Sequence, residues 1–353
     1  MDFLKNKKVL YIGQSFFGYE LEIKNMLESM GATVDYYNER PSNTFWTKVF
    51  IRINAKQLIN SKIKVYYDEI LKKIQNIQYD YVFIVKIETI DKQILKRLKS
   101  NQKNAKFFLY MWDSIKNYKG KEKLLSYFDK SFSFDSDDVK IYKELIFLPL
   151  FYIPIYEKIK TQKIIYDICF IGSGHSDRYK LISEIKKKSI ELGLSFYLFF
   201  FLQSEKIFLF RKLFDKRMRD AKIDDFSFTS LSQEETLDII SQSKVVVDIE
   251  HPGQVGLTMR TLEMLGCQKK LITTNKSVRE YDFYNEDNIL VVERNNIKLN
   301  KSFFELPYQK LSNDIYEKYS LKNWIKTIFS EENEWYYCVT SILVYAYEDC
   351  ING

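Results

Sequence analysis

The sequence predicts an α/β fold built on parallel sheets. Short apolar runs alternate with amphipathic helical segments through most of the 353 residues, which is the pattern of successive strand–helix–strand units. The pattern is clearest in residues 8–37 and in residues 245–275. A chain of this length is expected to form two domains of ordinary size, each of which can bury its own core. We therefore expect two α/β domains with parallel sheets.

Residues 245–275 read VVVDIEHPGQVGLTMRTLEMLGCQKKLITTN and form the most complete unit. The apolar run at residues 245–249 is bounded by polar residues, as in a buried parallel strand. A helix is expected from Thr258, which can cap it, to about Leu265, and Gly266 suits its C-terminal stop. The loop between strand and helix lies beyond the carboxyl end of the strand, where open α/β sheets bind ligands.

This loop and the helix after it carry groups suited to a nucleotide. His251 and Gly256 lie in the loop, and the N–H groups at a helix N-terminus favour a phosphate. Arg260, in the first helical turn, can add a charge-assisted contact. Glu263, one turn further on, can accept hydrogen bonds from ribose hydroxyls. The alternative is a structural crossover that carries a surface Arg and a surface Glu.

The first domain is expected to cover residues 1–158. It opens with a strand over residues 8–12, and the loop that follows contains Gln14 and Ser15. The glycines of this loop do not make a dinucleotide fingerprint. Asp113 follows a later strand at its carboxyl end, where catalytic groups collect. Asp113 is thus a candidate general base, and capping of the next segment is the alternative.

The second domain is expected over residues 159–330, after a Lys-rich linker. Its first strand leads into Gly172 and Ser173, a Gly-Ser turn that enters a helix and forms a second anion-binding loop. His175 and Arg178 belong to the same stretch. The only other histidine of the chain also falls in a loop after a strand, which favours ligand contact, although a loop histidine is usually plain polar surface.

Two stretches resemble a known family. The pattern MRTLEMLGCxKxLITTN and the loop FIGSGHSDR are similar to the donor-nucleotide segments of GT-B glycosyltransferases, most closely in the CgeB-like and lipopolysaccharide-biosynthesis branch. There, a helix of the form R-x-x-E-x-x-x-x-G holds the donor nucleotide. Many retaining members carry a Glu-x7-Glu pair; Glu263 matches its second Glu, whereas Val255 stands at the first position and departs from the pattern.

The resemblance implies a GT-B architecture, in which two Rossmann-like domains with parallel sheets face each other across a cleft. It implies an acceptor contact for Gln14 and Ser15, a base role for Asp113 in an inverting transfer, and a helix over residues 331–353 that returns to the first domain. The residues implied to contact the nucleotide-sugar donor are Gly172, Ser173, His175, Arg178, His251, Gly256, Thr258, Arg260 and Glu263.

The predicted activity is transfer of a sugar from a nucleotide-sugar donor to a surface glycan such as lipopolysaccharide or capsule, without a metal or another cofactor. Arg178, Arg260 and helix N-termini would stabilise the departing nucleotide diphosphate. Two alternatives stay open. One is a GT-B nucleotide-sugar epimerase, and the other is a non-catalytic two-domain protein that binds a nucleotide or a sugar.

The distribution of charge along the chain indicates which partners the protein can attract. The formal net charge is +7, and residues 1–155 hold 26 Lys or Arg against 18 Asp or Glu, whereas the later residues hold 28 against 29. The excess of positive charge in the first half can attract a lipid-linked glycan or the inner membrane. Alternatively, it can reflect the amino-acid composition that an AT-rich genome produces. Residues 207–218 alternate aromatic and basic residues on a predicted helix, which fits membrane contact or packing on a sheet. No cluster predicts nucleic-acid binding.

Localisation and redox state follow from what the sequence lacks. It contains no uninterrupted apolar stretch of about 18 residues and no signal-peptide pattern. A cytoplasmic protein is therefore expected, with peripheral attachment to the cytoplasmic face of the membrane as an option. The four cysteines are widely spaced, show no metal-ligand pattern and are expected to be free thiols.

Overall fold

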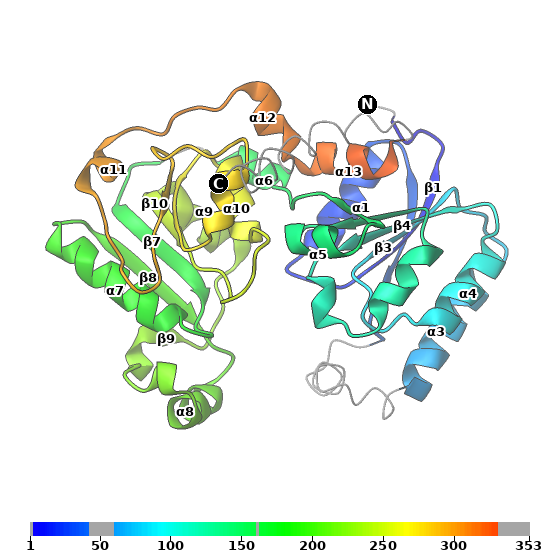
Figure 1. The fold of residues 1–353 in the computed structure, drawn as a ribbon, viewed down its shortest axis with the longest axis horizontal. Coiled ribbons are helices and arrows are strands. Elements are labelled where there is room, and N and C mark those ends of the chain that lie inside the picture. The colour runs from blue at the N-terminus through cyan, green and yellow to red at the C-terminus, as the bar shows by residue number, and fades with distance from the viewer. Residues whose placement is uncertain (1–2, 42–59, 160–161, 331–353) are drawn as a thin grey trace, which may run out of the picture. The chain divides into compact units, whose positions relative to one another are not determined.

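The computed structural model describes residues 3–41, 60–159 and 162–330. These residues form two compact units, each built on one six-stranded parallel sheet (Figure 1). The predicted α/β class with two parallel sheets is confirmed. The first unit runs up to Pro149 and resumes at Leu321, and the second lies between them.

The first sheet has the strand order β2-β1-β3-β4-β5-β6, and all neighbours are parallel. Its strands are β1 (Lys8–Gly13), β2 (Thr33–Asn38), β3 (Tyr81–Val85), β4 (Lys106–Met111), β5 (Lys130–Ser133) and β6 (Leu145–Phe147). The helices of this unit are α1 (Tyr19–Ser29), α3 (Asn60–Ile74), α4 (Lys92–Asn101), α5 (Ser136–Ile141) and α13 (Leu321–Phe329), with two 3-10 helices at Ile115–Asn117 and Lys121–Tyr127.

Both faces of the first sheet are covered, because its strands are apolar at successive positions and successive side chains point to opposite faces. One face packs on α3 and α4, which lie side by side (Figure 1), and it includes Leu10 and Ile12 of β1. The other face is aromatic and packs on α13. There the Trp324 ring lies 5.9 Å from Phe83 and 4.7 Å from Tyr110, measured between centroids.

The second sheet has the order β12-β11-β10-β7-β8-β9, again with every neighbour parallel. Its strands are β7 (Tyr166–Ser173), β8 (Phe196–Phe201), β9 (Phe226–Ser227), β10 (Ser243–Asp248), β11 (Lys270–Thr273) and β12 (Ile289–Val291). The helices of this unit are α6 (Pro154–Glu157), α7 (Arg178–Glu191), α8 (Glu205–Phe214), α9 (Gln233–Ser241), α10 (Met259–Gly266), α11 (Lys301–Glu305) and α12 (Asn313–Lys318). The 3-10 helices are Lys216–Met218, Ile223–Asp225 and Lys276–Glu280.

The boundary between the units lies earlier in the chain than residue 158, where the sequence placed it. The second unit starts at Leu150. The reason is that Pro154–Glu157, in the segment expected as a linker, forms α6 and packs on α10 of the second unit. The predicted helix at residues 331–353 lies outside the described residues. None of the helices that the structure describes is long and apolar enough to cross a bilayer.

The key helix α10 begins as predicted and ends differently. Thr258 is its N-cap, and its hydroxyl accepts a hydrogen bond from the Thr261 N–H at 3.3 Å. Gly266 is the last helical residue rather than the turn that stops the helix, and the positive φ of 52° belongs to Gln268. Close packing explains the glycine at position 266 instead, because a Cβ there would come within 2.8 Å of the Tyr152 ring.

Removal of the Trp324 side chain should destabilise the first unit. Trp324 is 2% exposed, and replacing such a residue with Ala typically lowers the free energy of unfolding by about 3–5 kcal/mol. Lys322→Ala, at an exposed position of the same helix, should change it by less than about 0.5 kcal/mol. Urea unfolding followed by circular dichroism measures both, and equal effects would show that α13 adds little to the core.

Candidate functional site

The second sheet changes direction between β7 and β10. The chain adds β8 and β9 on one side of β7 and then returns to place β10 on its other side. Loops that leave two such neighbouring strands diverge and open a crevice at the carboxyl edge, where α/β proteins bind ligands. His175 follows β7 and His251 follows β10, so the two loops singled out from the sequence flank this switch point.

The two loops come together through their histidines. The ring centroids of His175 and His251 lie 6.2 Å apart. His175 is half-buried, and burial, helped by the neighbouring Arg178 guanidinium, lowers its pKa from 6.5 to about 4. The exposed His251 donates its Nδ1–H to the Pro252 carbonyl at 2.9 Å. At neutral pH the His175 ring is therefore uncharged.

Asp248, the last residue of β10, fixes the start of α10. Its side chain is 4% exposed and accepts hydrogen bonds from the Thr258 hydroxyl and, at 2.9 Å, from the Thr261 hydroxyl. Gly256, in the loop between β10 and α10, accepts through its carbonyl from Gln254 Nε2 at 2.8 Å. The loop is thus held at both ends, and the N-terminus of α10 has a fixed position at the edge of the sheet.

Arg294 ties several loops together, and sequence reasoning missed it. Its guanidinium donates to Asp177 at 2.7 Å, to the Glu250 carboxylate at 2.6 Å and to the Glu250 carbonyl at 2.8 Å. Glu250 also accepts from the Thr274 hydroxyl at 2.5 Å. Arg294 follows the end of β12, so its place at the carboxyl edge of a parallel sheet was the available signal.

Arg178 opens α7 beside these groups. Its Nε donates to the Ile249 carbonyl at 2.6 Å, which joins the start of α7 to the end of β10. Burial lowers the pKa of the Arg178 guanidinium; Asp248 and Glu250 oppose the shift, and the positive charges of Arg260 and Arg294 add to it. Arg178 and Arg294 both donate to main-chain carbonyls just beyond the end of β10, so their guanidinium groups lie near one another at the switch point. Arg260 lies in the first turn of α10, the helix that follows the same strand.

The first loop also shows why glycine stands at its start. Gly172 lies near the end of β7, where a Cβ would come within 2.8 Å of the Phe170 ring. Ser173 is the last residue of the strand, and its carbonyl accepts from the His175 N–H at 3.0 Å. The turn into α7 is therefore tight, and donor contacts by these two residues stay a prediction.

Arg260 and Glu263 share one face of α10, as their spacing of three predicts. Arg260 Nη1 lies 3.1 Å from Glu263 Oε2, and their side chains are 21% and 7% exposed. The Glu263 carboxylate also makes a hydrogen bond with the Tyr156 hydroxyl of α6, a contact that, behind burial, helps to raise the pKa of that phenol. The alternative of a surface Glu is wrong, because Glu263 is 5% exposed.

The first unit has its own switch point, between β1 and β3. Gln14, after β1, donates to Glu88, after β3, at 2.5 Å, and Arg40 forms a buried ion pair with the same carboxylate. Ser15 donates to Glu20 at 2.7 Å. Both predicted acceptor residues thus lie at the carboxyl edge, within hydrogen-bond networks of the protein.

Asp113 lies just beyond the end of β4. Its carboxylate pairs with the Lys86 ammonium and accepts from the Tyr118 hydroxyl at 2.7 Å. The following 3-10 helix begins after Ser114 and has no side-chain cap, so the Asp113 side chain does not serve that helix. It is 42% exposed and keeps access to solvent at the carboxyl edge.

A nearby acidic group has a structural role. Asp135 accepts from the Asp137 N–H at 3.0 Å and caps α5. Asp138 is buried and accepts from the Ser114 and Ser133 hydroxyls at 2.8 and 2.9 Å. Within the described parts of the chain, no three His, Cys, Asp or Glu side chains are grouped to hold a metal ion.

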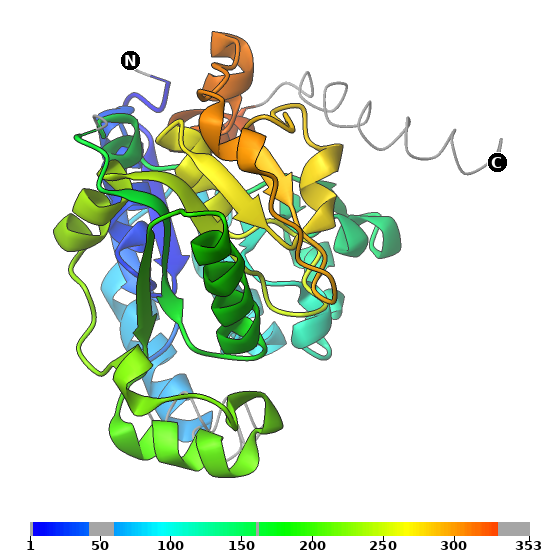
Figure 2. The ribbon, with the colours of Figure 1, turned by 90° about the vertical axis from the view of Figure 1, so that its left-hand side faces the viewer.

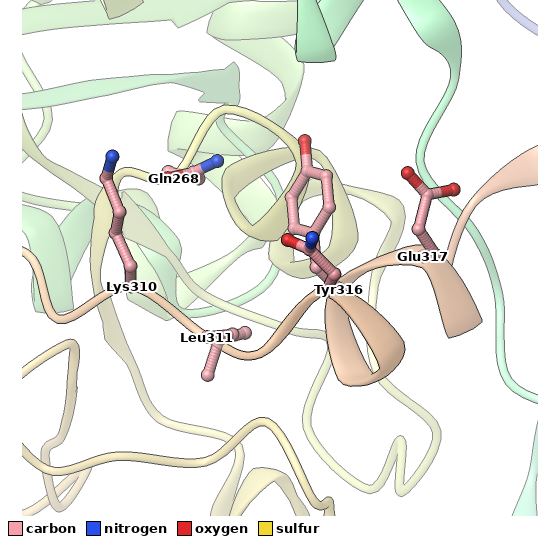
Figure 3. Close-up of a pocket in the computed structure, with 6 residues that line it drawn as sticks. Gln268, Lys310, Leu311, Tyr316 and Glu317 are labelled. Carbon is pink, nitrogen blue, oxygen red and sulfur yellow. The ribbon is translucent and has the colours of Figure 1, made fainter.

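A small pocket of about 330 Å³ lies elsewhere in the second unit (Figure 3). Gln268, Lys310, Tyr316 and Glu317 line it. Gln268 stands between the end of α10 and the start of β11, at the amino edge of the sheet. The pocket is therefore at the opposite edge from the loops that follow β7 and β10, and it is not the predicted donor site.

No model of a known protein family matches the chain, and no curated protein matches it. Solved structures do match. The UDP-forming α,α-trehalose-phosphate synthase from Burkholderia xenovorans, in complex with glucose-6-phosphate, is 8% identical with a TM-score of 0.59, over 91% of this chain and 98% of that one. The N-terminal domain of Candida albicans trehalose-6-phosphate phosphatase is 12% identical with a TM-score of 0.53, over 97% of both chains.

The Anabaena protein HepE, in complex with UDP-glucose, is 10% identical with a TM-score of 0.50, over 99% of this chain and 100% of that one. At such identities the likeness concerns the fold. The likeness spans nearly the whole chain, and the predicted GT-B fold is confirmed.

His175 should make the folded protein sensitive to acid. Its pKa is about 4 in the folded state against 6.5 ordinarily, so the unfolded chain binds the extra proton first as the pH falls. Its contribution to stability is complete above pH 6.5 and is lost between that pH and about 4. His175→Asn should flatten the pH dependence of the melting temperature in this window.

The lowered pKa of His175 can also be measured directly by NMR. Because the chain has only two histidines, the His175→Asn variant assigns both imidazole signals in a proton NMR titration. The His175 signal should move near pH 4. A midpoint at an ordinary histidine value for both signals would show that the loop after β7 is open to water.

Proposed function

We propose that the protein is a glycosyltransferase that transfers a sugar from a UDP-sugar to a glycan acceptor without a metal ion. The observation that carries the proposal is the arginine-rich switch point of the second sheet, set in a GT-B fold. It joins an anion-binding helix N-terminus to guanidinium groups, the chemistry that a departing nucleoside diphosphate needs. The UDP-glucose bound to HepE supports the choice of nucleotide.

The donor would lie against the loops after β7 and β10. As the bond between the anomeric carbon and the β-phosphate oxygen breaks, negative charge develops on the diphosphate. Arg178 and Arg260, together with the N–H groups at the start of α10, would stabilise that charge. Glu263 would accept from the ribose hydroxyls, which fits its place one turn further from the helix N-terminus than Arg260.

The acceptor would belong to the first unit, with Asp113 as general base. The carboxylate would take the proton of the acceptor hydroxyl as its oxygen attacks the anomeric carbon, which gives inversion. Lys86 and Tyr118 would hold the carboxylate in place through the contacts described above. Gln14 and Ser15, on the loop after β1, would contact the acceptor sugar.

A surface glycan of the lipopolysaccharide or capsule type is the acceptor that the sequence resemblance supports. The proposed transfer can be distinguished from the activity of an epimerase by experiment, because an epimerase would change the configuration of the donor sugar without any acceptor. A transferase supplied with donor alone releases UDP slowly, by transfer to water, and leaves the configuration of unreacted donor unchanged.

Arg260→Ala should weaken binding of UDP about ten- to a hundredfold, because it removes a charge-assisted contact of roughly 1.5–3 kcal/mol. Binding of uridine should be spared, whereas Glu263→Ala should weaken both ligands alike. Lys244→Ala is the control, since it removes a positive charge from the other end of β10, where Lys244 pairs with Asp167. Calorimetric titration gives all affinities, and an equal loss for uridine and UDP in the Arg260 variant would show that this arginine does not contact phosphate.

Asp113→Asn should reduce UDP release from the preferred UDP-sugar by roughly a hundredfold or more, as expected for loss of a general base, with UDP affinity unchanged. The matched control is Asp137→Asn, because Asp137 is 41% exposed and paired with Lys140, much as Asp113 is 42% exposed and paired with Lys86. A panel of UDP-sugars, screened by thermal shift and then by UDP release, identifies the donor. If no UDP-sugar raised the melting temperature or released UDP, the proposed function would be wrong.

A further inference from the structure

Helix α8 exposes most of its large apolar side chains to solvent, unlike an ordinary surface helix. A surface helix usually turns an apolar stripe to the core and its charges to water. In α8, Phe208 is the one buried apolar side chain, and its ring packs 5.2 Å from Phe226. Figures 1 and 2 both show α8, in light green, beyond the sheet of its own unit.

The outer face of α8 is apolar. Leu209, Phe210, Leu213 and Phe214 are 59%, 64%, 76% and 68% exposed. Their spacing places them together on one side of the helix, and the Phe210 and Phe214 rings lie 4.8 Å apart. We call these four residues the α8 patch. Single exposed apolar side chains are common on proteins, but a contiguous group of large ones marks a contact surface.

Two cations of the helix point the other way and hold the patch outward. Arg211 Nη1 donates to the Gly174 carbonyl at 2.7 Å, and Lys212 Nζ donates to the Ala221 carbonyl at 2.8 Å. Lys212 also lies over the Phe208 ring, 5.7 Å from its centroid. The helix is therefore fixed by its polar side, and the exposure of the patch follows from those bonds.

The surroundings of the patch are basic. Residues 205–222 contain seven Lys or Arg against three Asp or Glu, a net charge of +4. Lys206, Lys216, Arg219 and Lys222 are exposed among them. The second half of the chain as a whole carries almost no net charge, so the positive charge is concentrated next to the patch. An apolar face flanked by cations is the pattern of an interfacial helix on an anionic bilayer.

We propose that the α8 patch inserts into the surface of a membrane that contains anionic lipids. Phe210, Leu213 and Phe214 would enter the boundary between headgroups and acyl chains, while Lys216 and Arg219 would contact lipid phosphates. A symmetric contact between two copies of the chain is disfavoured, because each would bring its positive charges against those of the other.

Membrane contact through the α8 patch would also position the second switch point relative to the lipid surface. Arg211 links α8 to Gly174, in the loop after β7 at the second switch point. Membrane contact would therefore hold that loop at a fixed distance from the lipid surface. An acceptor anchored in the same membrane would meet the enzyme at high local concentration. The contact itself does not depend on the proposed transfer reaction.

Sedimentation with lipid vesicles tests the proposal. The full-length protein should bind vesicles of phosphatidylcholine and phosphatidylglycerol in equal parts, bind pure phosphatidylcholine much less, and lose affinity as salt rises. The double variant Phe210→Ser, Phe214→Ser should bind the anionic vesicles at least about tenfold less, since it removes two exposed rings that gain from insertion. Lys216→Glu with Arg219→Glu should also bind less and lose most of the salt dependence.

Ile190→Ser is the matched control, because Ile190 is 60% exposed on α7 of the same unit but lies outside the patch; its vesicle affinity should equal that of the wild type. Phe214→Trp places an indole in the patch, and its fluorescence should shift to the blue when vesicles are added. Equal binding by the wild type and the double serine variant would overturn the proposal. So would a wild-type dimer in analytical ultracentrifugation that the double variant dissociates.

Discussion

Buried carboxylates at the carboxyl edges of the two sheets fix the loops that carry the candidate site. A charge taken out of water is costly unless several donors meet it, so a buried acid dictates the path of the chain around it. In the first unit, Glu39 is fully buried and accepts from the N–H groups of Glu88, Thr89 and Ile90. In the second, Asp248 and Glu250 have the same role toward hydroxyls and Arg294.

This constraint also decides how the arginines of the second unit are presented. Arg178 bonds to a main-chain carbonyl, Arg260 pairs with Glu263, and Arg294 bridges two carboxylates. Each side chain is therefore oriented before any ligand arrives, and little reorganisation would be needed when negative charge develops nearby. Burial is the largest cause of the lowered pKa of the Arg178 guanidinium, and the carboxylates of Asp248 and Glu250 oppose that shift.

Local patterns in the sequence predicted much of this arrangement. The alternation of apolar runs and helices gave both parallel sheets, the cap at Thr258 was readable from residue type, and the spacing of Arg260 and Glu263 placed them on one face. What the sequence could not show depends on contacts between distant segments. Arg294 meets Asp177 across more than a hundred positions, and no local pattern encodes such a pair. The outward turn of α8 likewise rests on a bond from Arg211 to another loop.

The place of α13 in the chain has a consequence for biosynthesis. Its Trp324 and Phe329 cover the aromatic face of the first sheet, against Phe83 and Phe108 among others. The ribosome makes the whole second unit before it reaches Leu321. Domains begin to fold during synthesis. The aromatic face of the first sheet therefore lacks its α13 cover until synthesis of the second unit is complete. The second unit is in effect an insertion within the first, and an interrupted synthesis would leave all six strands of the first sheet in place but one apolar face without its α13 cover.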